Sequence, residues 1–346
     1  MLTAEKVKQA AKAMGADLCS IGTPDRWEGA PAQMDPRFIM PEAKSVIAFG
    51  FRIMRGSLRG IEEGTFFSNY SSMGYGGLNW LYMPMTMMNV AKYIEDYGYE
   101  AIPLGHLSPW RAIDNVGNLK GGSRPVEPGK PAPDVMVHLR IAGFLCGMGE
   151  IGWSKVFLTP EFGPRQRIGV MLTEAELEPD PIFEPHLCDR CMLCASECPG
   201  AISAERSVKA TIGGYDLEWN DLDCDRCRDA FRGGEYAEEG EKGEYMSHVG
   251  QEGIKPSPIT PFYRRPNKVY EHGEAICGGK GCIRACMISL EERGVLANKF
   301  DAPFRRREQW SVDWDGYNSG RLKNDELPPN AVKPREKDRT TVDIDE

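Results

Sequence analysis

Four cysteines within eleven residues constrain this chain more than any other feature of its sequence. Cys188, Cys191, Cys194 and Cys198 are spaced C-x2-C-x2-C-x3-C, and Pro199 follows them. Each iron of a cubane [4Fe–4S] cluster takes one thiolate, so three thiolates on a tight loop reach three corners of one cube. The fourth thiolate points away and binds a second cluster. A zinc knuckle usually pairs C-x2-4-C with a distant second pair, and so dense a run makes a poor disulfide frame. The spacing favours iron–sulfur clusters over both alternatives.

Two cubanes need eight of the nine cysteines in the second half of the chain. The first predicted ligand set is Cys188, Cys191, Cys194 and Cys286. The second predicted set is Cys198, Cys227, Cys277 and Cys282. Cys224 is left over, and spacing alone leaves the choice between Cys224 and Cys227 open.

Composition narrows the class of protein. The chain has 346 residues, 27% of them charged and 41% hydrophobic, with a net charge of -9. That length suits two domains with a sizeable core, and the acidic balance argues against a nucleic-acid or membrane-surface binder. Clustered cysteines suit a reducing compartment. With no signal-like start and no apolar run of ~18 residues, we expect a cytoplasmic protein that does not span a membrane.

Hydrophobic periodicity predicts the local structure. We expect helices at residues 3–14, 84–97 and 135–146, where apolar side chains recur at helical spacing. We expect strands at residues 17–22, 45–51, 99–104 and 167–172, and a short strand after Gly200. The segment 60–77 is dense in glycine and serine and predicts a loop, as does 119–133. An acidic linker at 174–184 predicts a domain boundary before the cysteine run.

A glycine-rich stretch precedes that linker. It runs Gly-Met-Gly-Glu-Ile-Gly from residue 147 to 152 and continues to Thr-Pro-Glu-Phe-Gly-Pro-Arg at 159–165. Three glycines in six residues let the backbone approach something closely. The stretch lacks the Gly-Lys-Ser/Thr ending of a P-loop and misses the dinucleotide-binding spacing, so neither of those sites is predicted.

This stretch, followed by the cysteine run, resembles the reductive dehalogenase and epoxyqueuosine reductase superfamily. The resemblance covers roughly residues 1–290 and is strongest from about 140 to 200. It implies an α+β fold: a nitroreductase-like corrinoid-binding domain at 1–175, then a ferredoxin-like domain with two [4Fe–4S] clusters at 176–300. An acidic insertion near 228–275 and a polar tail at 301–346 complete the predicted organisation.

The resemblance also implies site residues. It favours Cys227 over Cys224, because Asp223-Cys-Asp-Arg-Cys227 matches the family's context for a lone cluster cysteine. The final cysteine motif departs from the family, since Cys277 to Cys282 is wider and Met287 replaces proline. For the nucleotide tail of base-off cobalamin, the predicted binding residues are Gly147, Gly149, Gly152, Ser154, Lys155, Thr159 and Arg165. Glycine N–H groups with Lys155 or Arg165 suit the phosphate in that tail, although Arg165 and Arg167 also fit a simple strand edge.

A reduction of this kind needs a proton donor. The family uses tyrosine, assisted by lysine or arginine, or else aspartate. The predicted catalytic residues are Asp134, Tyr75 and Tyr70. His106 and His138 are further candidates, although a lone histidine is more often structural.

The resemblance predicts a cobalamin-dependent iron–sulfur reductase of a small organic substrate. An external one-electron donor, such as a ferredoxin or flavodoxin, would be its partner. Two alternatives stay open: an electron-transfer protein that reduces a partner's corrinoid, and an epoxyqueuosine reductase-type enzyme acting on tRNA. The chain shows no twin-arginine signal and no C-terminal helical repeat, and its acidity argues against tRNA. A flavin in place of the corrinoid is a further option.

Overall fold

The computed structural model describes residues 1–63, 66, 69–105, 124–198, 202–223, 227 and 281–305, with only the backbone of Ser71. Several predictions fall outside these residues. They concern Pro199, His106, Cys224, Cys277, the insertion at 228–275, and the tail beyond residue 305.

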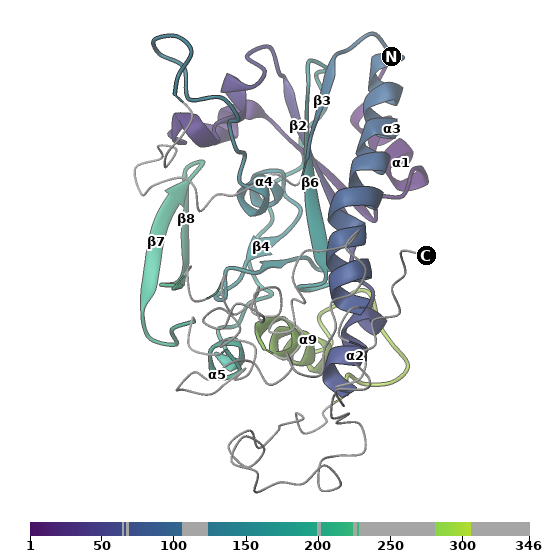
Figure 1. Ribbon diagram of the computed structural model, residues 1–346, viewed down its shortest axis with the longest axis vertical. Helices are drawn as coiled ribbons and strands as arrows, with labels where there is room; N and C mark the ends of the chain where they lie inside the picture. The colour runs from purple at the N-terminus through teal and green to yellow at the C-terminus, as the bar shows by residue number, and fades with distance from the viewer. Residues whose placement is uncertain are drawn as a thin grey trace, which may run out of the picture.

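A four-stranded sheet forms the centre of the molecule (Figure 1). Its strands are β1 Leu18–Gly22, β2 Ser45–Arg52, β6 Gln166–Thr173 and β3 Ala101–Leu104, in the order β1-β2-β6-β3. Every neighbouring pair is antiparallel. The four strands lie close to the positions that the apolar runs predict.

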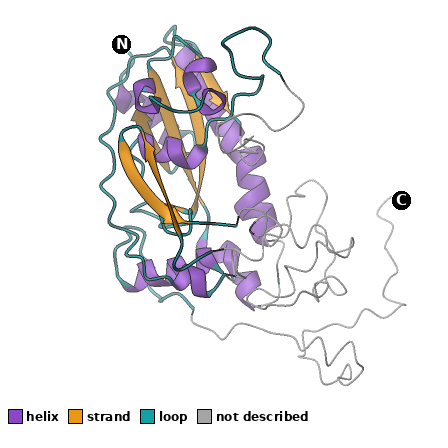
Figure 2. Cartoon of the chain, turned by 90° about the vertical axis from the view of Figure 1, so that its left-hand side faces the viewer, coloured by secondary structure: helices purple, strands orange, loops and turns teal. Residues whose placement is uncertain are grey.

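Helices cover both faces of this sheet, which explains why β2 is buried from Ser45 to Phe51. Ile47, Phe49 and Phe51 pack on the face that carries α1 Ala4–Ala13 and α3 Met83–Glu95. The alternate residues of β2 pack on the other face, against α4 Leu139–Leu145. The hairpin of β7 Ser207–Ile212 and β8 Tyr215–Asn220 lies beyond α4, away from α3 (Figures 1 and 2). The mixed helix-and-sheet architecture is as predicted.

Helix α1 shows how local sequence sets an element. The Thr3 hydroxyl accepts a hydrogen bond from the Lys6 N–H at 3.3 Å, which caps the first turn. Val7 and Ala11 are the buried residues of the helix and belong to the core. The predicted helix at residues 3–14 is confirmed.

The prediction of a loop at 60–77 is wrong. This segment contains α2 Arg59–Glu63 and the start of a π-helix, Tyr70–Tyr82, which continues into α3. Its glycines permit close packing. A Cβ at Gly74 would lie 2.8 Å from the Tyr70 ring, and one at Gly60 would collide with the Phe66 carbonyl. Glycine density therefore marks tight contacts here, which composition alone does not distinguish from a loop.

Two further boundaries differ from expectation. Only Leu139–Leu145 of the predicted helix at 135–146 is helical, because His138 is the N-cap and its backbone is extended. The strand expected directly after Gly200 begins only at Ser207. Short 3₁₀ turns fill other connections, at Pro24–Trp27, Ala32–Met34, Pro36–Phe38 and Arg55–Leu58.

The cysteine-bearing helices lie at one end of the sheet, below β4 in Figure 1. They are α5 Leu193–Ser196 and α9 Cys282–Glu292, and they accompany the small hairpin of β4 Glu150–Ile151 and β5 Phe157–Leu158. Leu158 of this hairpin packs with Leu187, Leu290 and Leu296. Segments on the two sides of the predicted boundary at 175 thus share one apolar cluster, and the division into domains stays a prediction.

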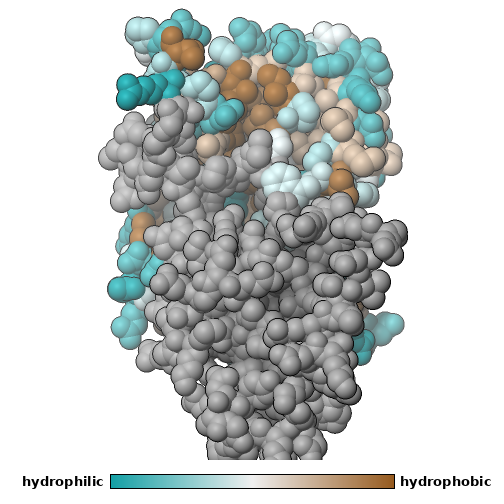
Figure 3. Space-filling view, in the orientation of Figure 1, coloured by the Kyte–Doolittle hydropathy of each residue, from teal (hydrophilic) through white to brown (hydrophobic). Residues whose placement is uncertain are grey.

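Exposed apolar side chains occur on several elements of the described surface, among them α3. In Figure 3, a hydrophobic group stands among hydrophilic residues in the upper part of the view. Met87 of α3 is buried, whereas Met85 and Met88 are exposed, so only part of its methionine run fills the core. Among the residues that the structure describes, no helix is long and apolar enough to cross a membrane.

Candidate iron–sulfur site

The loop from Cys188 to Cys194 is wound tightly by two left-handed residues. Arg190 has φ +57° and Met192 has φ +59°, conformations that non-glycine residues adopt rarely. The Cys191 N–H donates to the Asp189 carboxylate at 3.2 Å, which closes the turn. Strain of this kind persists where the surrounding structure fixes it, commonly at functional sites. The result is a loop whose three cysteines line one pocket.

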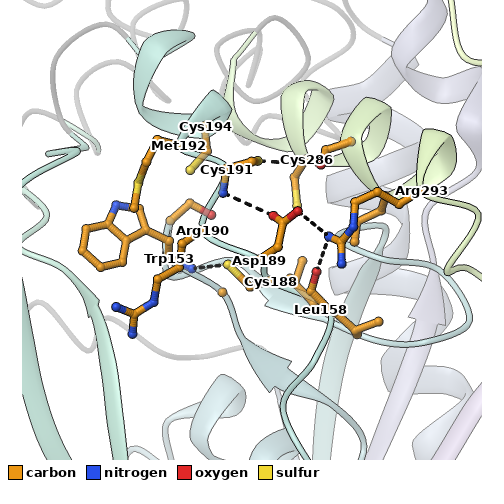
Figure 4. A pocket seen from close by; sticks show the side chains of 15 residues that line it. Trp153, Leu158, Cys188, Asp189, Arg190, Cys191, Met192, Cys194, Cys286 and Arg293 are labelled. Carbon is orange, nitrogen blue, oxygen red and sulfur yellow. Dashed lines mark hydrogen bonds and ion pairs between the residues drawn. The ribbon is translucent and has the colours of Figure 1, made fainter.

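Helix α9 supplies the opposite wall of that pocket (Figure 4). Cys286, Ser289, Leu290 and Arg293 line it at the i, i+3, i+4, i+7 spacing of one helix face. The Ser289 hydroxyl lies 3.7 Å from the Cys191 sulfur. The structure thus brings together all four cysteines of the first predicted set, and their binding of iron stays a prediction.

The thiols of this set influence one another electrostatically. Burial raises the pKa of the Cys194 thiol to about 12, with smaller contributions from charge on Cys188 and Cys191. Burial also raises the pKa of Cys286 well above its ordinary value, and charge on Cys188 and Cys194 adds to that rise. Thiols in such surroundings give up their protons only to a strong compensating positive charge, which metal ions supply.

Three members of the second predicted set also gather. Burial raises the pKa of the Cys282 thiol well above its usual range, and charge on Cys227 and Cys198 raises it further. These cysteines therefore lie within electrostatic range of one another. The fourth member, Cys277, is outside the described residues. Cys282 and Cys286 are four residues apart on α9, so one helix contributes to both sets.

The cysteine pocket does not resemble a single-ion site. In the described ranges, no three His, Cys, Asp or Glu side chains converge closely enough to hold one metal ion. A cubane spreads its thiolates farther apart, because each binds a different iron at a different corner. Four thiols that line one pocket without meeting at a single point fit such a cluster.

The glycines of the glycine-rich stretch pack closely against other segments of the protein. A Cβ at Gly149 would collide with the Leu158 carbonyl, and one at Gly147 would collide with the Pro181 carbonyl. A Cβ at Gly152 would lie 3.0 Å from the Leu158 side chain. These contacts alone account for the glycines, so their predicted role toward a cofactor remains a prediction.

The other predicted tail-binding residues separate into two groups. Ser154 lines the cysteine pocket, and the Lys155 ammonium lies 5.7 Å from the Trp219 ring centroid. Thr159 is fully buried, and its hydroxyl donates to the Gln166 side chain at 3.1 Å. The structure does not assemble the seven residues into one phosphate site.

Arg165 belongs to the buried group. It is 1% exposed, and its guanidinium donates to the Ile53 carbonyl at 2.9 Å and to the Asn298 side chain at 2.8 Å. Burial lowers the pKa of Arg165 to about 10. These bonds tie the residue just before β6 to two other segments, which is a structural role that a strand-edge arginine in solvent would not have.

A second cluster of polar groups joins the two candidate tyrosines. The Arg167 guanidinium donates to the Tyr70 hydroxyl at 2.8 Å and lies 4.5 Å from the Tyr75 ring centroid. It also donates to the Gly74 carbonyl at 3.3 Å. Sequence reasoning did not assign Arg167 this position. The pairing arises because the π-helix packs across β6, a contact between segments almost a hundred residues apart.

Asn79 lies on the same π-helix and has no partner among the residues described. It is fully buried, and neither the oxygen nor the nitrogen of its amide makes a hydrogen bond there. Buried amides are nearly always satisfied. In a helix with i to i+5 bonds, Asn79 follows Tyr75 by about one turn and Tyr70 by about two turns. An orphaned amide on that face is the kind of group that a bound molecule satisfies.

Asp134 and His138 lie elsewhere. Asp134 is exposed, and its carbonyl accepts from the Gln33 side chain at 3.3 Å, in the segment that leads to α4. The Nδ1 atom of His138 accepts from the Ile141 N–H at 3.4 Å as the N-cap of α4. Helix α4 and the π-helix pack on opposite faces of the sheet, so neither residue joins the tyrosine cluster.

Known proteins share part of this sequence. Tetrachloroethene reductive dehalogenases of Desulfitobacterium hafniense and Dehalobacter restrictus are each 36% identical over a 93-residue alignment. The alignment covers 23% of this chain and 17% of each relative, so it spans less than a fifth of the relatives' own length. No protein-family model matches the chain.

Solved structures show a weaker likeness. A catabolic reductive dehalogenase has a TM-score of 0.46 at 15% identity, over 89% of this chain and 41% of that one. Epoxyqueuosine reductase from Streptococcus thermophilus has a TM-score of 0.44 at 15% identity, over 83% and 80%. The sequence match is the stronger likeness, and over its 93 aligned residues the chain is similar to tetrachloroethene reductive dehalogenases.

Proposed function

We propose that this protein is an iron–sulfur reductase of a small organic substrate that uses a base-off corrinoid. The observation that carries the proposal is the convergence of Cys188, Cys191, Cys194 and Cys286 on one pocket, from two segments about ninety residues apart in sequence. Their spacing and their shared pocket match the needs of a [4Fe–4S] cluster. The similarity to tetrachloroethene reductive dehalogenases supports the reductase class.

Two clusters would share helix α9. Cys286 faces the first cysteine set, and Cys282, one turn earlier, lies with Cys198 and Cys227. This arrangement suits one-electron transfer between two centres held by one helix. Because such centres accept one electron at a time, the proposal includes an external one-electron donor such as a ferredoxin or flavodoxin.

The corrinoid part of the proposal comes from the family resemblance. A bound corrinoid would supply a low-valent cobalt as the reductant of the substrate. Of the residues predicted for its nucleotide tail, Ser154 and Lys155 are best placed to contact a ligand, because Thr159 and Arg165 are buried and bonded within the protein. We keep Lys155 as the candidate for the tail phosphate.

The tyrosine cluster supports a proton-donating role. Tyr75 is partly exposed, whereas Tyr70 is fully buried, so Tyr75 is the better candidate donor to a substrate. The Arg167 guanidinium over its ring would stabilise the negative charge left on a tyrosine that has given up its proton. Tyr70 accepts a hydrogen bond from the same guanidinium and holds it in place. Asn79 has an amide without a hydrogen-bond partner among the described residues, and a molecule bound on this face would satisfy it.

Anaerobic reconstitution tests this proposal. The protein would be supplied with iron, sulfide and cobalamin, desalted, and examined by metal analysis and absorption spectroscopy. We expect about eight irons per chain, two cubanes' worth, with one cobalt and base-off corrinoid bands. Eight irons without cobalt would favour an electron carrier or a flavin protein. Absence of iron uptake would overturn the proposal entirely.

A further inference from the structure

Glu150 holds the chain that leads into the cysteine loop. Its carboxylate is 3% exposed and accepts three consecutive backbone hydrogen bonds. The N–H groups of His186 and Leu187 donate to Oε2 at 2.6 and 3.0 Å, and the Cys188 N–H donates to Oε1 at 2.7 Å. A buried carboxylate bonded by three amides is a strong, directional anchor.

Two other contacts fix the same loop. The Trp153 N–H, on the chain just after β4, donates to the Cys188 sulfur at 3.3 Å. Arg293, the C-cap of α9, donates to the Leu187 carbonyl at 2.7 Å and lies 3.3 Å from the Asp189 carboxylate. Cys188 is thus held through its backbone by Glu150 and through its sulfur by the amide of Trp153.

Charge near a cluster changes its reduction potential. A negative group close by disfavours the added electron, while hydrogen bonds to the cysteine sulfurs favour it. The effect is large for buried groups, because the low local dielectric strengthens the interaction. Glu150 is such a group, fixed through the Cys188 amide beside the pocket that the first cysteine set lines.

We propose that Glu150 is a positioning residue for the first cluster, which fixes Cys188 and lowers that cluster's reduction potential. This inference rests on the proposed function, because it requires a cluster in the pocket. The β4–β5 hairpin that carries Glu150 leads directly into β6, so the first cluster would be anchored to the central sheet.

The test compares Glu150→Gln and Glu150→Ala with the matched control Glu178→Gln. Glu178 is exposed, so its change removes the same charge without touching the loop. Two quantities would be measured: the midpoint potentials of both clusters by EPR-monitored titration of reconstituted protein, and amide hydrogen exchange at 186–188 in the apoprotein.

In Glu150→Gln we expect a positive shift of one midpoint potential, while the other cluster serves as an internal reference. Exchange at 186–188 should accelerate, because an amide nitrogen faces one of the three donors. Glu150→Ala should exchange faster still and lose about half of its iron, since the loop is released. Glu178→Gln should match the wild type in every respect.

Wild-type potentials and wild-type exchange in Glu150→Gln would overturn the inference, whether or not Glu150→Ala folds. Equal shifts of both potentials would also overturn it, because they indicate a general rather than a local effect. If the wild type itself takes up no iron, the proposed function fails. Exchange in the apoprotein then still decides whether Glu150 holds the loop.

Discussion

The cysteine loop at 188–198 and the glycine-rich stretch at 147–165 border the same pocket, but their side chains face different partners. Cys188, Cys191 and Cys194 line the pocket, together with Cys286. Gly147 and Gly149 face carbonyl groups of their own chain instead. Four thiols around one pocket suit a metal cluster, because thiolates are strong metal ligands. A glycine serves any close approach, whether of a ligand or of a neighbouring strand.

Ligand removal gives the largest expected effect. Cys188→Ser should lose about half of the bound iron, because the first cluster loses a ligand while the second stays intact. Cys282→Ser should lose the other half. Cys19→Ala is the control, since Cys19 lies on β1, outside both sets. Iron and sulfide content after anaerobic reconstitution measures this, and unchanged iron in Cys188→Ser would contradict the predicted sets.

Substitution in the glycine-rich stretch should lower the stability of the protein even when no cofactor is bound. In Gly149→Ala the new methyl group would collide with the Leu158 carbonyl, so we expect the apoprotein to lose about 3 kcal/mol of stability. Gly56→Ala is the control, because no atom lies within 4 Å of a Cβ there. Urea unfolding of both apoproteins measures the difference. Wild-type stability in Gly149→Ala with weaker cobalamin binding would instead assign this glycine to the ligand.

Removal of the candidate proton donor should slow turnover with all cofactors bound. We expect Tyr75→Phe to lose about 100-fold in rate, the low end of general acid catalysis. Tyr99→Phe, on the surface after α3, is the matched control. Rates would be measured with a substrate found by screening, using a chemical reductant. Full activity in Tyr75→Phe with normal iron and cobalt content would exclude the role.

Substitution of Lys155 should affect cobalamin binding, whereas substitution of Arg165 should affect stability. Lys155→Met should weaken cobalamin binding by about tenfold, the worth of one charge-assisted contact, and leave stability nearly unchanged. Arg165→Lys should lower stability by about 2 kcal/mol, because it leaves the Ile53 carbonyl or the Asn298 side chain without a donor. Fluorescence titration with cobalamin and urea unfolding distinguish them. The reverse outcome would make Arg165 the ligand contact.

The smallest expected effect is the pH dependence of stability that His138 causes. Burial first, and then the Arg140 charge, lower its pKa to about 3. The unfolded chain takes up a proton near pH 6.5 and the folded chain does not. Protonation of His138 therefore does not affect the free energy of unfolding above about pH 6.5. That free energy falls as the pH drops from about 6.5 toward 3, because only the unfolded chain gains the proton. Between about pH 7.5 and about pH 5.5 the loss is about 1 kcal/mol.

His138→Asn keeps an N-cap residue and should remove this pH dependence. Urea unfolding of wild type and variant at the two pH values measures it. An equal loss of stability in both proteins would assign the acid sensitivity to other groups.

Local sequence was sufficient for the elements whose pattern is local. The helix at 3–14 and the strand at 45–51 follow from apolar periodicity and from a capping threonine, which act over a few residues. The prediction of a loop at 60–77 failed because Gly60 and Gly74 permit closely packed helices there. Composition alone does not reveal such packing. The predicted helix at 135–146 was too long because the backbone is still extended at His138, which is the N-cap of α4.

The sequence by itself predicted the first cysteine set, because thiolate spacing in the run at 188–198 reflects the geometry of a cluster, and its four members line one pocket in the structure. The ligand roles of both sets stay predictions. Only the tertiary structure decided the positions of Glu150, Arg167 and Asn79. Each depends on contacts across the fold: a hairpin reaching the cysteine loop, and a π-helix crossing β6. Contacts between segments far apart in the chain produce no local sequence pattern, so no motif predicts them.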